Sequence, residues 1–160
     1  MEKGAKPEDG NYNAVRKEKP EILKLLIAAG SDVSSYKLMD MAVNHFNETL
    51  IKLLIDNKGN LTYVTKRKKN SYLHRVAEKK GKENLVKLFI DAKVDLEARN
   101  KWGETPLLVA VQKRKNVATI KLLIDAGADV NAKSNKGKSV LKRSKGKSNS
   151  NLLKEAGAVK

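Results

Sequence analysis

The sequence predicts an all-α repeat solenoid of about five helix–turn–helix units, because similar segments return at an interval of 34 residues. Leu107 has one counterpart 34 residues earlier in Leu73 and another 34 residues later in Leu141. A fixed period of this size is typical of solenoids, whose units bury their apolar faces against their neighbours. Aromatic residues make up only 4% of a chain that is 40% hydrophobic. The core between units must therefore rest on aliphatic side chains.

Residues 100–132 contain the most complete copy of the unit, and its helix signals have local physical reasons. Thr105 can cap the free amides of a first helical turn, and Pro106 fits position N1, where no N–H is missed. Gly127 can adopt the left-handed conformation that ends a second helix. This copy therefore predicts a turn, a short first helix, a loop and an amphipathic second helix.

The other units follow the same order along a single predicted domain of residues 10–160, after a leader at residues 1–9 that we expect to be disordered. Pro20 is expected to open a second helix that stops at Gly30. The predicted units cover approximately residues 10–33, 34–66, 67–100, 101–133 and 134–160. In the last unit the helices are shortened and joined by a polar link, as expected of a terminal cap.

The connection after the first unit is short. We call the segment between one unit's second helix and the next unit's first helix a finger. Val33 and Leu38 are five positions apart, whereas the equivalent Leu96 and Leu107 are eleven positions apart. The first finger is therefore expected to be missing or reduced to a tight turn.

Apolar residues in each second helix recur at helical spacing, as do Leu85, Leu88 and Phe89 or Ile120, Leu123 and Ile124, which predicts one face buried against the neighbouring unit. On this pattern, replacing Leu88 or Leu122 by Ala is expected to cost about 2–5 kcal/mol.

The fourth unit resembles the ankyrin repeat, through Gly103-Glu104-Thr105-Pro106-Leu107 near its start and Gly127-Ala128-Asp129-Val130-Asn131 near its end. The resemblance covers about residues 11–158 and weakens outward from this unit. The third unit, for example, has Lys93 where the family has a stop glycine. The resemblance implies an ankyrin-like stack with β-hairpin or turn fingers, and a concave surface of fingers and first helices that binds protein partners. It also implies that His74 braces neighbouring loops by hydrogen bonds.

The positive charge lies in one part of the chain. Residues 1–65 hold nine basic and nine acidic residues, whereas residues 66–160 hold 25 basic and nine acidic residues, which gives the net charge of +16. Composition alone offers another explanation, because an A/T-rich genome yields many Lys codons, and only six of the 34 basic residues are Arg. The asymmetry between the two parts favours a basic binding face in units three to five.

Placed on the family's concave surface, the basic residues and the single Trp give a candidate binding site. The predicted partner-binding residues are Arg67, Lys68, Lys79, Arg99, Lys101, Trp102, Lys113, Arg114 and Lys136. By resemblance, the positions most exposed to a partner also include Asn70, Glu78, Glu104 and Gln112. Trp102 is expected to be the apolar anchor, because exposed aromatics beside cations are common in interfaces.

Two classes of function remain open. The first is a monomeric, non-enzymatic protein-interaction module that grips an acidic partner segment by electrostatic steering. The second is nucleic-acid binding through contacts to the phosphate backbone. Near the basic positions only Trp102 and Tyr72 are aromatic, so base stacking would be limited.

Catalysis, cofactors and metals have no support in the sequence. The two histidines fall in different units and there is no cysteine, so no metal site is recognisable. No nucleophile elbow, phosphate loop or zinc-protease motif occurs. The polar N-terminus and the lack of a stretch of about 18 apolar residues argue against a signal peptide and a membrane span. We expect a cytoplasmic protein, with delivery into a host cell or a nuclear location as alternatives.

Overall fold

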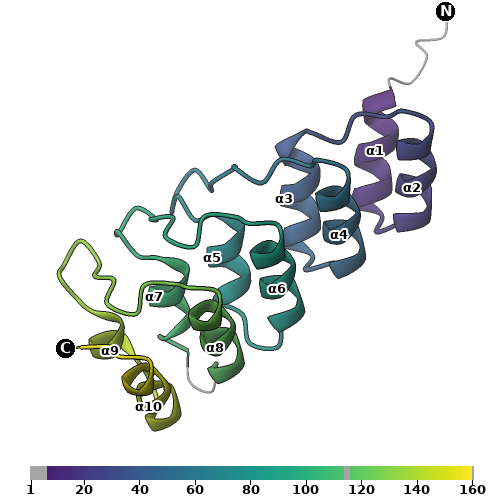
Figure 1. Cartoon of the computed structure of the whole chain (residues 1–160). Coiled ribbons are helices and arrows are strands. Elements are labelled where there is room, and N and C mark those ends of the chain that lie inside the picture. The colour runs from purple at the N-terminus through teal and green to yellow at the C-terminus, as the bar shows by residue number, and fades with distance from the viewer. Residues whose placement is uncertain (1–6, 114–115, 160) are drawn as a thin grey trace, which may run out of the picture. The chain divides into compact units, whose positions relative to one another are not determined.

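The computed structural model describes residues 7–113 and 116–159, and within these ranges the chain forms ten α-helices in five consecutive pairs (Figure 1). The chain divides into two compact units, unit 1 at Met1–Tyr63 and unit 2 at Val64–Lys160. Each holds several helix pairs, and from here on each helix pair is called a repeat. Unit 1 holds α1 (Pro7–Arg16), α2 (Pro20–Ala28), α3 (Tyr36–Asn44) and α4 (Glu48–Asp56). Unit 2 holds α5 (Tyr72–Ala77), α6 (Glu83–Asp91), α7 (Pro106–Ala110), α8 (Val117–Asp125), α9 (Val140–Arg143) and α10 (Lys147–Glu155).

The predicted all-α repeat fold is confirmed. In unit 2 the first helices α5 and α7 lie side by side, and so do the second helices α6 and α8 (Figure 1). Thr105 caps α7 as expected, since its hydroxyl accepts a hydrogen bond from the Leu108 amide at 3.3 Å, and Pro106 occupies the first helical position. Ser71 and Ser139 cap α5 and α9 in the same way. The prediction of one domain over residues 10–160 stays a prediction.

The start of the first helix differs from the sequence-based expectation. Helix α1 begins at Pro7 and so includes the end of the stretch 1–9 that was expected to be a disordered leader. Proline is well tolerated at the first position of a helix, because the N–H that it lacks would have no helical partner there. Residues 1–6 lie outside the described part of the chain.

The fingers are turns rather than hairpins. Residues 29–35 join α2 to α3 directly, which agrees with a missing first finger, whereas residues 92–105 and 126–139 form full-length fingers. The β-hairpin form of the fingers is not confirmed, because the described residues contain no strand and only an isolated antiparallel bridge between Lys133 and Ser139.

Backbone hydrogen bonds join the successive fingers of unit 2. The Lys101 amide donates to the Lys68 carbonyl at 3.0 Å, and the Asn135 amide donates to the Trp102 carbonyl at 2.9 Å. Gly103 has φ of +69°, and a Cβ at this position would lie 2.0 Å from the Asn135 side-chain oxygen. Glycine is therefore required where the third and fourth fingers of the chain meet.

Most of the predicted buried face of the second helices is confirmed, but Leu88 and Leu122, the two leucines chosen for substitution, lie at its edge. Leu85, Phe89 and Leu123 are fully buried, whereas Leu88 and Leu122 are only half-buried. The expected loss of stability of about 2–5 kcal/mol for Leu→Ala applies to fully buried side chains. It is therefore expected for Leu85→Ala and Leu123→Ala. The apolar stripe is wide enough that spacing alone did not identify its centre.

His74 braces two repeats, as the resemblance implied. The Ser71 amide donates to Nδ1 of His74 at 3.3 Å, so Nδ1 is the acceptor and the ring proton is on Nε2. Nε2 donates to the Glu104 carbonyl at 2.8 Å, which links α5 to the start of the next repeat. Burial of the ring is the main cause that lowers the pKa of His74 from its ordinary value of 6.5.

This lowered pKa predicts a loss of stability in acid. The unfolded chain takes up a proton at His74 before the folded chain does, so the stability contributed by the neutral ring is complete above pH 6.5 and is lost as the pH falls below it. Urea unfolding between about pH 7.5 and pH 5 should show this loss in the wild type and a flatter dependence in His74→Gln. Parallel curves for the two proteins would contradict a buried neutral His74.

Candidate functional site

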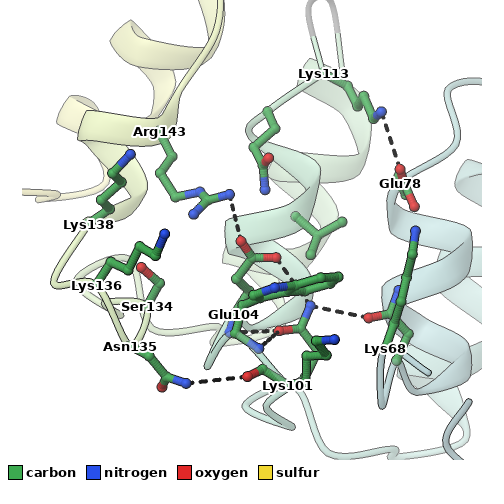
Figure 2. A pocket seen from close by; sticks show the side chains of 15 residues that line it. Lys68, Glu78, Lys101, Glu104, Lys113, Ser134, Asn135, Lys136, Lys138 and Arg143 are labelled. Atoms are coloured by element: carbon green, nitrogen blue, oxygen red, sulfur yellow. Dashed lines mark hydrogen bonds and ion pairs between the residues drawn. The ribbon is translucent and has the colours of Figure 1, made fainter. Parts of the chain in front are cut away.

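Unit 2 contains a pocket of about 570 Å³ between the fingers and first helices of its repeats. Figure 2 shows residues of the fifth repeat, among them Lys136, Lys138 and Arg143, on one side and Lys68, Glu78 and Lys113 on the other. The volume falls within the range of about 300–1,000 Å³ that is common for ligand-binding sites. The pocket is thus large enough to take one or two side chains of a partner.

The lining of the pocket carries an excess of positive charge. Both acidic side chains are already paired, since Glu78 Oε1 lies 3.2 Å from Lys113 Nζ and Glu104 Oε1 lies 2.6 Å from Arg143 Nη2. No carboxylate in residues 7–113 and 116–159 pairs with the four remaining cations of the lining, which are Lys68, Lys101, Lys136 and Lys138. An anion entering the pocket would therefore meet four uncompensated ammonium groups.

Trp102 lies at the tip of the finger that precedes α7 and remains 40% exposed. The Lys101 ammonium lies 5.3 Å from the centre of its indole ring, within the range of a cation–π contact. The backbone on both sides of the ring is held, because the Trp102 amide donates to Oδ1 of Asn100 at 2.9 Å and the Trp102 carbonyl accepts from Asn135. The indole is therefore an exposed apolar surface on a fixed backbone.

A hydrogen-bonded network of buried polar side chains forms the base of the pocket. Asn100 donates from Nδ2 to Asn70 Oδ1 and to Glu104 Oε2, each at 3.1 Å, and its Oδ1 accepts from the Glu104 amide at 3.1 Å. Asn70 and Glu104 are only 7% and 8% exposed. The expectation that these two residues are among those most exposed to a partner was therefore wrong. Their finger positions are turned inward because the network satisfies their polar groups within the protein.

Five of the nine predicted binding residues come together in this pocket, namely Lys68, Lys101, Trp102, Lys113 and Lys136. Arg67 and Lys79 are exposed but do not line it. Arg99 holds two fingers together, because its Nη1 donates to the Gly103 carbonyl at 3.0 Å and to the Lys133 carbonyl at 2.8 Å. Arg114 lies outside the described residues. The role of the nine residues in binding stays a prediction.

Six lining residues were not among those selected from the sequence as binding or partner-exposed, namely Asn100, Val109, Ser134, Asn135, Lys138 and Arg143. The position of Arg143 in the repeat register could have identified it from the sequence. It lies 34 residues after Val109, which is buried, so the repeat register places an Arg at an inward-facing position. A cation at such a position requires a carboxylate partner, and the register could have directed attention to Glu104.

Neither a metal site nor a membrane span is present in the part of the chain that the structure describes. There, no three His, Cys, Asp or Glu side chains gather closely enough to hold a metal ion. None of the helices observed there has the length and apolar character needed to cross a bilayer.

Comparison with known proteins gives two matches. The family model for ankyrin repeats, in three copies, matches residues 38–134. A probable serine/threonine-protein kinase of Dictyostelium discoideum is 33% identical over 79 residues, which cover 48% of this chain and 9% of that protein. The likeness to this relative is thus confined to a small part of its length.

Proposed function

The chain belongs to the ankyrin-repeat family, whose repeats generally mediate protein–protein interaction, and we propose that this one is a non-enzymatic module that binds an acidic segment of a protein partner. The segment enters the pocket of unit 2, where its carboxylates meet the ammonium groups of Lys68, Lys101, Lys136 and Lys138. The observation that carries the proposal is that these four cations surround an exposed indole and pair with no carboxylate among the described residues.

The positive charge of the pocket favours an acidic partner both in the affinity of the complex and in the rate of association. Exposed lysines each contribute little to affinity, about 0.2–1 kcal/mol, but several of one sign around a concave site attract an oppositely charged chain and steer its approach. The paired carboxylates of Glu78 and Glu104 keep Lys113 and Arg143 in place without cancelling the excess.

Trp102 supplies the apolar part of the contact. Large aromatic side chains at the centre of an interface commonly carry much of the binding energy. The partner is therefore an acidic segment that also presents an apolar side chain to the indole. Lys101, positioned over the ring, brings charge and apolar surface into one place.

The kinase activity named for the relative does not extend to this chain in our proposal. The match covers 9% of that protein, and ankyrin repeats are typically non-catalytic. The sequence also lacks the Gly-x-Gly-x-x-Gly loop that covers the ATP phosphates in protein kinases.

Nucleic-acid binding is the second candidate, and the exposed run of four cations at residues 66–69 favours it. Against it, Tyr72 is 1% exposed and its ring stacks on Phe89 with centroids 5.9 Å apart. Trp102 is then the one aromatic near the basic positions that can stack on a base, and sequence-independent binding to single strands relies on several such platforms.

Fluorescence of Trp102, the single tryptophan, tests the proposal directly. We expect saturable binding of an acidic peptide with one aromatic residue, weakening about several-fold between low and physiological salt. A peptide of the same composition with Lys in place of the acids is the control. Saturable binding of random-sequence nucleic acid, with no response to the acidic peptide, would overturn the proposal in favour of the second candidate.

A further inference from the structure

One wall of the pocket is formed by a tight turn of the last finger. The Ser134 amide donates to the Lys138 carbonyl at 3.1 Å, and the Gly137 amide donates to the Ser134 carbonyl at 2.8 Å. Gly137 has φ of +66°, a conformation that glycine adopts without strain. The turn is also tied to the preceding finger through Asn135 and the Trp102 carbonyl. Lys136 and Lys138 therefore project from a fixed backbone.

This wall presents hydrogen-bond donors that lack acceptors. The hydroxyl of Ser134, a residue only 7% exposed, has no hydrogen-bond partner in the described part of the chain, and the same is true of the Arg143 Nε–H. Lys136 and Lys138 add two ammonium groups that pair with no carboxylate in residues 7–113 and 116–159. Figure 2 shows Ser134, Lys136, Lys138 and Arg143 on the same side of the pocket.

The lining carboxylate that contacts this wall, Glu104, is already engaged. Glu104 uses Oε1 for Arg143 at 2.6 Å and Oε2 for Asn100 at 3.1 Å. Unpartnered donors next to a pocket cost free energy unless a ligand or solvent satisfies them. A ligand group suited to this wall must therefore bring several acceptor oxygens and more than one negative charge.

We propose, building on the proposed function, that this wall is a phosphoryl subsite, and that the partner's acidic segment is recognised in a form phosphorylated on Ser or Thr. A phosphoserine or phosphothreonine side chain carries about −1.5 to −2 charges at neutral pH and three acceptor oxygens, whereas Glu offers one charge and two oxygens. Its oxygens accept from Lys136, Lys138 and Ser134, while the flanking acidic residues face Lys68 and Lys101.

Three peptides that differ at one position test the subsite. The peptide is an acidic segment with one aromatic residue, and its central residue is Ser, Glu or phosphoserine. Binding to the full chain is measured by Trp102 fluorescence at about pH 7.5, where the phosphoryl group is largely dianionic. We expect the phosphoserine peptide to bind roughly tenfold more tightly than the Glu peptide, with the Ser peptide weakest.

Two variants that lose the same number of positive charges show where on the protein the preference for phosphoserine arises. Lys136→Gln with Lys138→Gln removes the two cations of the wall, whereas Lys133→Gln with Lys142→Gln removes two exposed cations of the same finger and the following helix α9 that do not line the pocket. The first variant should bind the phosphoserine and Glu peptides about equally, and the second should keep the preference. Circular dichroism establishes that both variants fold.

Each other outcome has a distinct meaning. Equal affinity for phosphoserine and Glu peptides in the wild type would overturn the phosphoryl subsite and leave the proposed function intact. A preference that persists in Lys136→Gln/Lys138→Gln would overturn its placement on this wall. No binding of any of the three peptides would overturn the proposed function and the subsite together.

Discussion

Replacing Arg143 by Ala is expected to destabilise unit 2 by about 3 kcal/mol, because it leaves the Glu104 carboxylate largely buried without its cation. The two side chains are 19% and 10% exposed, and the bond between them is 2.6 Å long. After the change, the side-chain amide of Asn100, at 3.1 Å, is the one partner of the carboxylate that remains among the described residues. One such hydrogen bond does not offset the cost of desolvating a charge. Denaturant unfolding of the full chain measures the loss.

A double-mutant cycle separates this effect from a simple loss of packing. Glu104→Ala leaves the backbone bonds of Glu104 to His74 and Asn100 in place and removes only the carboxylate. If the ion pair is the cause, Arg143→Ala combined with Glu104→Ala should cost clearly less than the sum of the two single changes. Additive losses would show that the two residues act independently.

The fold could be predicted from the sequence because each repeat carries its signals locally. Thr105-Pro106 and the interval of 34 residues identify a helix start and its register without any long-range information. The start of α1 at Pro7 was missed because a short polar segment has no periodic apolar pattern to extend the helix. Leu88 and Leu122 were chosen as substitution sites although they lie at the edge of the buried face, because tertiary packing selects the centre of a wide apolar stripe.

The candidate site was predictable only in part, for a different reason. Finger positions recur at the repeat interval, so the repeat register brings the side chains at these positions to one surface. These side chains are Lys68, Lys101, Trp102 and Lys136. The inward turn of Asn70 depends on a hydrogen bond from Asn100, 30 positions away, and that of Glu104 on Asn100, 4 positions away, and on Arg143. Composition and spacing do not encode these pairings. Arg99 looked like a binding cation but donates to two carbonyl groups of neighbouring fingers.

The variant Lys68→Glu/Lys136→Glu/Lys138→Glu reverses the three lining lysines, other than Lys101, that pair with no described carboxylate, and it is expected to weaken binding of the acidic peptide at least about 100-fold. Each reversal removes an attraction of about 0.5–1 kcal/mol and introduces a repulsion of similar size, and a factor of ten corresponds to about 1.4 kcal/mol. All three side chains are exposed and none pairs with a described carboxylate, so the free energy of unfolding should change little. A large loss of stability would mean that these lysines hold the fold.

A variant with the same change in net charge serves as the control. Lys17→Glu/Lys24→Glu/Lys37→Glu alters three exposed lysines of unit 1, none of which lines the pocket. The ratio of the two variants' dissociation constants for the acidic peptide therefore tests whether binding depends on the pocket of unit 2 or only on the net charge of the chain. The account predicts a loss of about 100-fold or more for the pocket variant and of no more than about threefold for the control. Equal losses in the two variants would contradict it.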